Sequence, residues 1–161
     1  MTPQTAPRRA DPPASPAIER AVIGAALLDY EGLRAEGLGS LTAADYFLPV
    51  HTLAWRAIER VAATGTPVSV LTVAHALAEA GEIDDFDALV APDYCEPYLV
   101  GCWGDCASAV GASAWARIVH DYAERRRAIA RGSAIVRDAH RGKATEEPAI
   151  YDRDEYKGVE F

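Results

Sequence analysis

The cysteines and histidines are the residues whose types suit metal chemistry. Cys95, Cys102 and Cys106 lie close together in the chain, and His120 follows them. Zinc prefers four thiolate or imidazole ligands, usually in closely spaced pairs. Here Cys102 and Cys106 are separated by one residue more than the commonest spacing, and the other two ligands form no pair. We therefore interpret the cysteines as small buried hydrophobic residues. An unrelated all-α metal-binding protein that uses these four ligands is kept as an alternative.

No arrangement of residues in the sequence specifies catalysis. A phosphate-binding P-loop has two glycines that flank four residues, followed by lysine and a hydroxyl residue. Gly142 and Lys143 have Arg137 in the place of the first glycine and Ala144 in the place of the hydroxyl residue. The four histidines are scattered, and no nucleophile motif accompanies them. We interpret His51 as a hydrogen-bonding or packing residue, and we predict a non-enzymatic protein with no cofactor and no metal.

Length and composition indicate one ordinary domain. The chain has 161 residues, half of them hydrophobic, with a net charge of −8 and three cysteines. No apolar run approaches the ~18 residues needed to cross a bilayer, and no hydrophobic stretch follows Arg8 and Arg9 as in a secretory signal. An odd, small number of cysteines favours a reducing compartment. These features predict a soluble cytoplasmic protein.

The charges are unevenly distributed along the chain. Residues 79–105 contain eight acidic residues and no lysine or arginine, whereas residues 117–141 contain seven arginines. This pattern favours protein–protein contact or self-association, and two solvated faces of one bundle are an equal alternative. The candidate interaction residues are Arg117, Arg125, Arg126, Arg127, Arg131 and Arg137. Direct DNA binding through this run, with Arg141 included, is a further hypothesis, but the negative net charge predicts weak or no binding to nucleic acid.

Hydrophobic periodicity and capping residues predict an all-α fold. We expect a disordered lead-in over residues 1–14, a helical domain over 15–143 and an acidic tail over 144–161. Ser15 and Pro16 predict the start of the first helix, and a short helix and a turn should follow around Gly32. Further helices are expected at 49–64, 70–80 and 113–140, the last of them long enough to project from a small bundle. One or two short helices within a long loop are expected over 81–111.

Several residues are assigned structural roles by the same signals. Gly65 and Gly81 follow predicted helices, where glycine can adopt the left-handed conformation. Pro67 lies in the turn between two helices, Ser69 can cap the second of them, and Asp45 can brace the turn before 49–64.

Four blocks, in this order, resemble the N-terminal domain of DnaB-family replicative helicases. The first is the run from Ile18 to Asp29 (IERAVIGAALLD), which includes Gly24. The second is Asp45-Tyr46-Phe47 with His51 and Trp55 to Ile58, and the third extends from Gly65 to Gly81. The fourth comprises Trp115 to Val119 and then Arg126 or Arg127. The resemblance covers about residues 16–141.

The chain also departs from the family's pattern. Ser69 stands where the family usually has aspartate, but either residue can cap the helix. The acidic stretch between Gly81 and Tyr98 is longer than usual. Residues 114–141 resemble the first arm of the helical hairpin that pairs two subunits in the family. The tail from Ala144 does not resemble the second arm, and the linker and ATPase domain have no counterpart in the sequence.

The resemblance implies a replication-associated domain that works by protein contact. In the family this domain forms a collar on a hexameric ring, self-associates, and helps to receive primase or loader proteins. Such a domain would have no ATPase motor of its own, and its partners would be helicase subunits, primase or a helicase loader. Whether the chain is a domain of a helicase or a stand-alone phage or mobile-element adaptor or decoy of the host helicase is left open.

Overall fold

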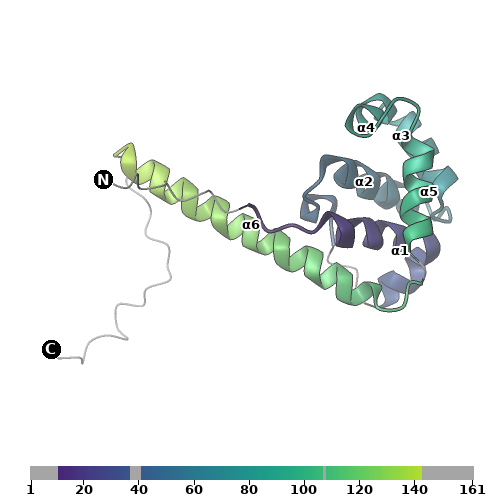
Figure 1. The fold of residues 1–161 in the computed structure, drawn as a ribbon, viewed down its shortest axis with the longest axis horizontal. Helices are drawn as coiled ribbons and strands as arrows, with labels where there is room; N and C mark the ends of the chain where they lie inside the picture. Colours follow the sequence, from purple (N-terminus) through teal and green to yellow (C-terminus); the bar gives the residue numbers. More distant parts are fainter. Residues whose placement is uncertain (1–10, 37–40, 107, 143–161) are drawn as a thin grey trace, which may run out of the picture. The chain divides into compact units, whose positions relative to one another are not determined.

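The computed structural model describes residues 11–36, 41–106 and 108–142, and these are helical without any strand. The predicted all-α fold is therefore confirmed. The chain divides into two compact units, one up to Arg126 and one from Arg127 onward, and each is described by itself (Figure 1). Most of the lead-in predicted at 1–14, and the whole tail predicted at 144–161, lie outside the described residues. No helix in the described segments has the length and hydrophobicity of a membrane span.

The first helix, α1, spans Pro16–Ala35 and begins at the predicted proline. Ser15 occupies the N-cap position, but its side chain accepts no capping hydrogen bond. The expected short helix after a break is instead joined directly to α1 through a kink at Asp29, where the backbone is non-helical. The Asp29 carboxylate accepts a hydrogen bond from the backbone N–H of Gly32 at 2.9 Å. This bond caps the last part of the helix and explains why the chain turns there without unwinding further.

Helices α2 (Pro49–Ala63) and α3 (Val70–Glu79) form where the periodicity predicts them. Gly65 and Gly81 follow them with φ of +73° and +68°, the left-handed conformation that glycine adopts without strain. Ser69 accepts a hydrogen bond from the backbone N–H of Thr72, and the Thr72 hydroxyl accepts one from the backbone N–H of Ser69. The Thr72 hydroxyl also lies 2.9 Å from the Pro67 carbonyl oxygen.

The acidic segment after Gly81 is more helical than the sequence suggested. It forms α4 (Ile83–Leu89) and α5 (Cys95–Asp105), joined by a short turn at 90–94. Among acidic and proline-containing neighbours, α4 buries only Phe86, and α5 buries Cys95, Leu99 and Cys102. The stripe on α5 is short and includes two cysteines, so it gives a weak hydrophobic signal. The expectation of one or two short helices is correct, but the expectation of a long loop around them is not.

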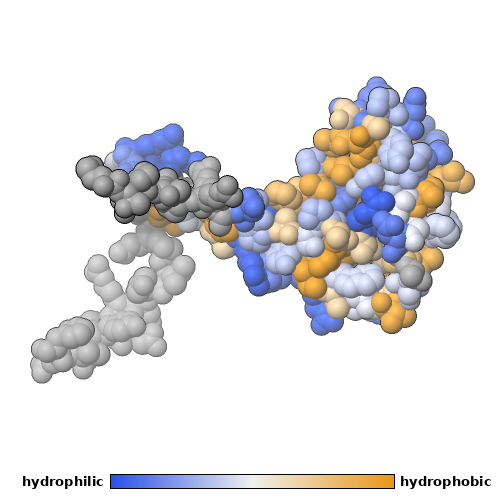
Figure 2. Space-filling model, in the orientation of Figure 1, coloured by the Kyte–Doolittle hydropathy of each residue, from blue (hydrophilic) through white to orange (hydrophobic). Residues whose placement is uncertain are grey.

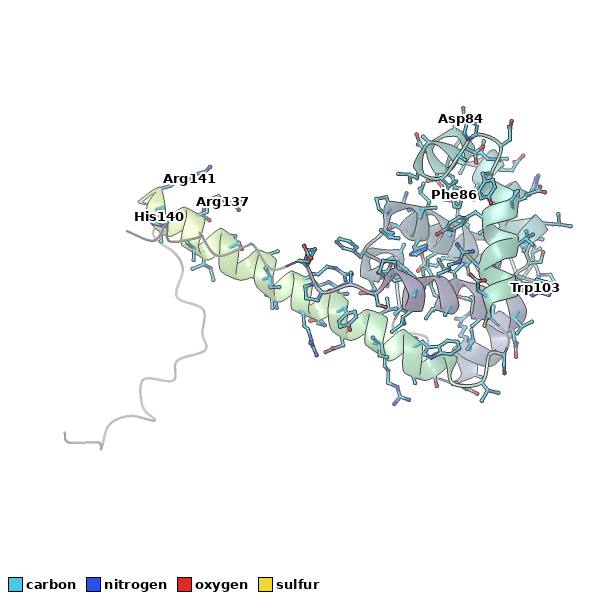
Figure 3. The ribbon with its side chains drawn as sticks, viewed as in Figure 1. Asp84, Phe86, Trp103, Arg137, His140 and Arg141 are labelled. Carbon is cyan, nitrogen blue, oxygen red and sulfur yellow. The ribbon has the colours of Figure 1, made fainter. Side chains whose placement is uncertain are left out.

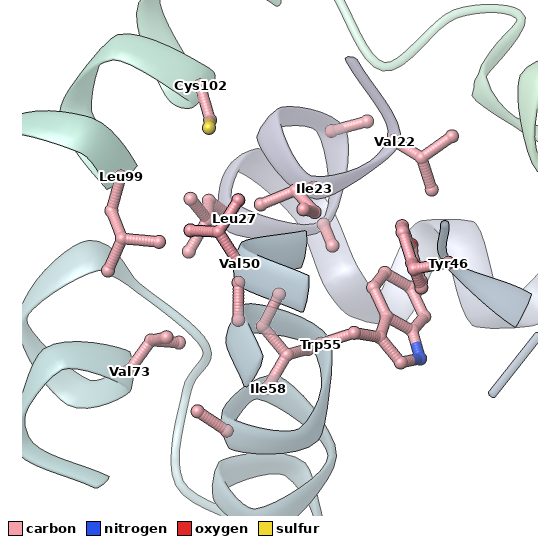
Figure 4. Close-up of a cluster of buried hydrophobic side chains, with 14 of the residues drawn as sticks. Val22, Ile23, Leu27, Tyr46, Val50, Trp55, Ile58, Val73, Leu99 and Cys102 are labelled. Carbon is pink, nitrogen blue, oxygen red and sulfur yellow. The ribbon is translucent and has the colours of Figure 1, made fainter. Parts of the chain in front are cut away.

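The core of the first unit lies between α1, α2, α3 and α5, with α4 closing one end (Figure 1). Figure 4 shows Val22, Ile23 and Leu27 of α1 facing Trp55 and Ile58 of α2. A buried methylene group contributes about 0.8 kcal/mol, so burial of these large side chains stabilises the unit. Gly24 allows α1 and α5 to approach each other, since a Cβ atom there would overlap the carbonyl oxygen of Cys102.

The last helix, α6, spans Ala112–His140 and is the longest of the described helices, with 29 residues. It begins one residue before the predicted cap Ser113, directly after Gly111, whose φ is +87°. Within the first unit its buried face consists of Ala112, Ala116, Val119 and Ala123. In the second unit, residues 127–140 have no buried residue, and Ile129 and Val136 are more than half exposed.

Candidate functional site

A chain of buried polar side chains connects α1, α2 and α5. Glu19 on α1 and His51 on α2 expose only 2% and 1% of their side chains. One carboxylate oxygen of Glu19 accepts a hydrogen bond from the backbone N–H of Phe47 at 2.8 Å, and the other lies 3.3 Å from the N–H of Leu48. His51 Nδ1 lies 2.8 Å from the same carboxylate, and His51 Nε2 lies 2.8 Å from the Tyr98 hydroxyl. This network joins α1, α2 and α5 with the backbone that leads into α2.

The chemistry of the groups assigns a direction to the first of these side-chain hydrogen bonds. A carboxylate only accepts, so His51 donates its Nδ1 proton to Glu19, while the Tyr98 hydroxyl, which can donate or accept, pairs with Nε2. Burial raises the pKa of Tyr98, which keeps its hydroxyl protonated. The order carboxylate, imidazole, hydroxyl resembles a catalytic relay. The near-complete burial of Glu19 and His51 puts them out of reach of a substrate, so the arrangement supports a structural role for the network.

Asp45 organises the turn before α2 and connects it to α6. It lies in the short 3-10 helix η2 (Ala43–Asp45), where its carboxylate accepts hydrogen bonds from the backbone N–H and hydroxyl of Thr42 at 2.8 and 3.1 Å. His120 Nδ1 on α6 lies 3.8 Å from the same carboxylate. The Arg126 guanidinium donates to the carbonyl oxygens of Asp45 and Pro13 and lies 5.6 Å from the Phe47 ring centroid. These contacts tie the N-terminal half of α6 to the rest of the first unit.

The structure divides the arginines predicted to mediate contacts into two groups. Arg126 binds within the first unit, as described above, Arg125 forms an ion pair with Asp121 one turn away at 2.7 Å, and Arg117 donates to the carbonyl oxygen of Ser113. Arg131 and Arg137, in the second unit, are exposed and have no ion pair among the described residues. Arg127 is half-buried. A role for any of these arginines in binding a partner stays a prediction.

The four residues considered as metal ligands do not come together. Among the described residues no three His, Cys, Asp or Glu side chains form a group that could hold a metal ion. The three cysteines are buried and not disulfide-bonded, and His120 lies at the Asp45 turn instead. Burial raises the pKa of Cys95 and Cys102 to about 11, which disfavours the thiolate form that binds zinc. The described part of the chain therefore does not bring these four residues together as a metal site.

Sequence reasoning missed several residues that the structure brings together. Glu19 is typical of an acidic residue in the first turn of a helix, and the other members of its network, His51 and Tyr98, are 32 and 79 positions further along the chain. Arg20 forms an ion pair with Asp105 at 2.7 Å and lies over the Tyr98 ring. The one available signal was the Glu-Arg pair at the start of α1, two polar residues next to an apolar stripe.

Exposed hydrophobic residues mark surfaces that the bundle leaves uncovered. Figure 2 shows such residues among hydrophilic ones on the visible face of the first unit. On α5 they are Val100 and Trp103, which are each about half exposed, and Trp103 points away from the bundle in Figure 3. In the second unit they are Ile129, Ile135 and Val136 of α6. Large apolar side chains at a surface indicate contact with another macromolecule when they lie together.

The fold and these surfaces define the class of the protein, an all-α domain with a buried polar network and uncovered helix faces. The DnaB-like helicase N terminal domain family matches residues 11–121, more than half of the chain. The chain belongs to that family. The crystal structure of the N-terminal domain of DnaB helicase from Mycobacterium tuberculosis is similar over 81% of this chain and 88% of that chain, with 28% sequence identity and a TM-score of 0.71. No curated protein sequence matches the chain.

Proposed function

We propose that this chain is a non-catalytic, replication-associated protein–protein interaction domain that works in the cytoplasm. Its partners are copies of itself and DnaB-type helicase subunits, together with the primase or helicase loader that such a helicase recruits. The observation that carries this proposal is the family assignment over residues 11–121. The similarity to a solved DnaB N-terminal domain, which covers most of both chains, supports it. A domain of this family contributes contact surface to a helicase assembly.

The exposed part of α6 supports self-association. Ile129 and Val136 are seven residues apart, so they lie two turns apart on the same face of the helix. Their exposed fractions are 56% and 58%, and no described residue covers them. Apolar residues at a seven-residue spacing are the pattern by which two helices pair along their length. We propose that this α6 face pairs with the same face of a second copy.

Contact with helicase subunits, primase or a loader can be tested with purified proteins. The full chain is immobilised, and a DnaB-type helicase, its primase and its loader are passed over it separately at micromolar concentrations. Binding of at least one of them supports the proposal, and binding of none of them contradicts it. The Ile129→Asp, Val136→Asp double variant shows whether the same α6 face also serves these partners. A parallel assay for ATP hydrolysis should show no turnover, since no P-loop motif is present in the sequence.

Direct binding to DNA stays a weaker prediction for the same chain. The arginines of α6 are opposed by a net charge of −8, which disfavours contact with phosphates. An electrophoretic shift of single-stranded or duplex DNA that weakens steeply with added salt would show that the arginines bind phosphates and would change the assigned partner class.

A further inference from the structure

One face of α5 forms an uncovered ridge on the first unit. Its exposed residues are Glu96, Pro97, Val100, Trp103 and Gly104. At 3.6 residues per turn these positions lie within about 120° of one another around the helix. The opposite face, which includes Leu99 and Cys102, is buried in the core. The α5 ridge therefore carries a half-exposed tryptophan and a carboxylate, with no basic residue among its members.

An acidic groove lies beside the N-terminal end of α5. It has a volume of about 540 Å³ and is lined by Asp84, Asp87, Ala88, Val90, Ala91, Pro92 and Asp93. Its walls combine carboxylates with small apolar side chains. One carboxylate oxygen of Asp87 is buried and has no hydrogen-bond partner among the described residues. Asp84 and Asp93 are exposed, so their carboxylates are the ones in this groove that an incoming N–H group can reach. Asp84 points outward from α4 in Figure 3.

The described part of the chain supplies no cation to these carboxylates. The segment 79–105 has no lysine or arginine. The nearby arginines bind other acids, because Arg56 and Arg60 both hold Glu82, and Arg20 holds Asp105. The hydrogen bond from Arg60 to Glu82 is the main cause that lowers the pKa of that carboxyl. Asp84, Asp87, Asp93 and Glu96 have no ion pair with any described residue.

The second unit carries the complementary chemistry. Residues 127–142 contain four arginines and one acidic residue, Asp138. The arginines lie within an arc of about 120° around α6, opposite the face of Ile129 and Val136. Asp138 lies on the arginine face and reduces its net charge. Figure 3 shows Arg137 and Arg141 at the end of the helix, and both are exposed.

We infer that the α5 ridge and the acidic groove of one copy bind the arginine face of α6 of another copy. The side chain of an arginine has an apolar stem that fits the alanine and valine walls of the groove, and a guanidinium that pairs with carboxylates in two parallel hydrogen bonds. Trp103 offers a ring face to a second arginine. Arg131 and Arg141 are about 15 Å apart along the helix, which matches the length of α5 at 1.5 Å per residue.

This contact differs in symmetry from the pairing under the proposed function, which it extends. Pairing of α6 with α6 uses the same face on both copies and stops at a dimer. The contact inferred here joins different faces, so it continues from copy to copy and forms a ring or a chain. It is also ionic, and salt screens it. The two contacts use opposite faces of α6, so the α6 helix of one copy can make both contacts at once.

Light scattering of charge-reversed full chains tests this inference. The groove variant is Asp84→Lys with Glu96→Lys, and the arm variant is Arg137→Glu with Arg141→Glu. The matched control is Glu31→Lys with Glu36→Lys, which makes the same charge change at exposed positions of α1 and its C-cap. At low salt the wild-type chain and the control should grow beyond a dimer as concentration rises. About 0.5 M NaCl should remove that growth.

Each reversed variant alone should associate beyond the dimer at least tenfold more weakly, and a mixture of the two should regain the larger species. Trp103→Ala should weaken the same step about tenfold, whereas Leu71→Ala, exposed on α3, should not. The inference is wrong if the wild type stops at a dimer in low salt, if the control loses as much as the groove variant, or if mixing restores nothing. A wild type that stops at a dimer leaves the proposed pairing intact. If the Ile129→Asp, Val136→Asp variant still forms larger species as concentration rises and the charge-reversed variants do not, the proposed pairing is wrong and this inference is supported.

Discussion

Replacement of Glu19 by glutamine should destabilise the domain far more than its isosteric character suggests. The carboxylate is 2% exposed and accepts three hydrogen bonds, from the backbone N–H groups of Phe47 and Leu48 and from His51. Glutamine has one accepting oxygen, so its amide group must point at least one N–H toward another N–H. The variant therefore leaves a buried donor without an acceptor in either orientation of the amide.

The magnitude follows from the contacts that are lost. A buried donor without a partner costs about 1–3 kcal/mol, and a hydrogen bond to a charged group contributes about 1.5–3 kcal/mol. One orphaned donor and the loss of charge at the remaining bonds together give about 2–4 kcal/mol for Glu19→Gln. The control Glu31→Gln makes the same chemical change at an exposed position of α1. Its effect should stay within about 0.5 kcal/mol.

Urea unfolding followed by tryptophan fluorescence measures both free energies, because Trp55 is 2% exposed and becomes hydrated on unfolding. With an m-value of about 1–3 kcal/mol per molar urea, Glu19→Gln should lower the midpoint by about 0.7–4 M. If Glu19→Gln folds too poorly to measure, Tyr98→Phe removes only the hydroxyl and should cost about 1 kcal/mol. The reasoning is refuted if Glu19→Gln and Glu31→Gln unfold at the same urea concentration.

Three further substitutions or conditions test the packing and capping of the same unit. Gly24→Ala should lower the free energy of unfolding by about 1–3 kcal/mol, because its methyl group would overlap the backbone of α5. The control Gly104→Ala, where an added Cβ meets no atom within 4 Å, should be neutral or stabilising. Equal urea midpoints for the two variants would contradict this account. Ser69→Ala should cost about 1 kcal/mol through loss of the α3 cap, and Ser69→Asp, which can still cap the helix, should retain most of the stability in the same titration. The pKa of Cys95 and Cys102 is raised to about 11, so the folded chain holds protons that the unfolded chain has released, and the free energy of unfolding should fall as pH rises from about 9 to 11. A variant with both cysteines changed to alanine should have a shallower slope, and the remainder comes from groups such as Tyr46, whose pKa is also raised by burial.

The sequence predicted the elements whose signals are local. The start of α1, the end of α2 and both ends of α3 follow from Pro16, Gly65, Ser69 and Gly81, each of which acts on backbone groups within a few residues. The acidic segment was harder to predict, because α5 buries only Cys95, Leu99 and Cys102, and its proline and glycines favour a loop. Tertiary contact with α1 overrides that local preference.

The residues that join the helices could not be found from periodicity. Glu19 meets His51 and Tyr98 only after α1, α2 and α5 have packed, so no short stretch of sequence contains the network. Trp103 was missed for a different reason, since a tryptophan on a helix is usually buried and gives no sign that it faces outward. The arginines of α6 were identified as a group. The sequence does not show which of them bind other residues of the chain, as Arg125 and Arg126 do.

The mass of the full chain in solution tests the central claim most directly. In about 0.5 M NaCl, where ionic contacts are screened, sedimentation equilibrium at micromolar concentration should give twice the 17.3 kDa of one chain. The Ile129→Asp, Val136→Asp variant should give the mass of a single chain with its helical content unchanged. A wild-type chain that stays monomeric, or a variant that stays dimeric, would contradict pairing through α6.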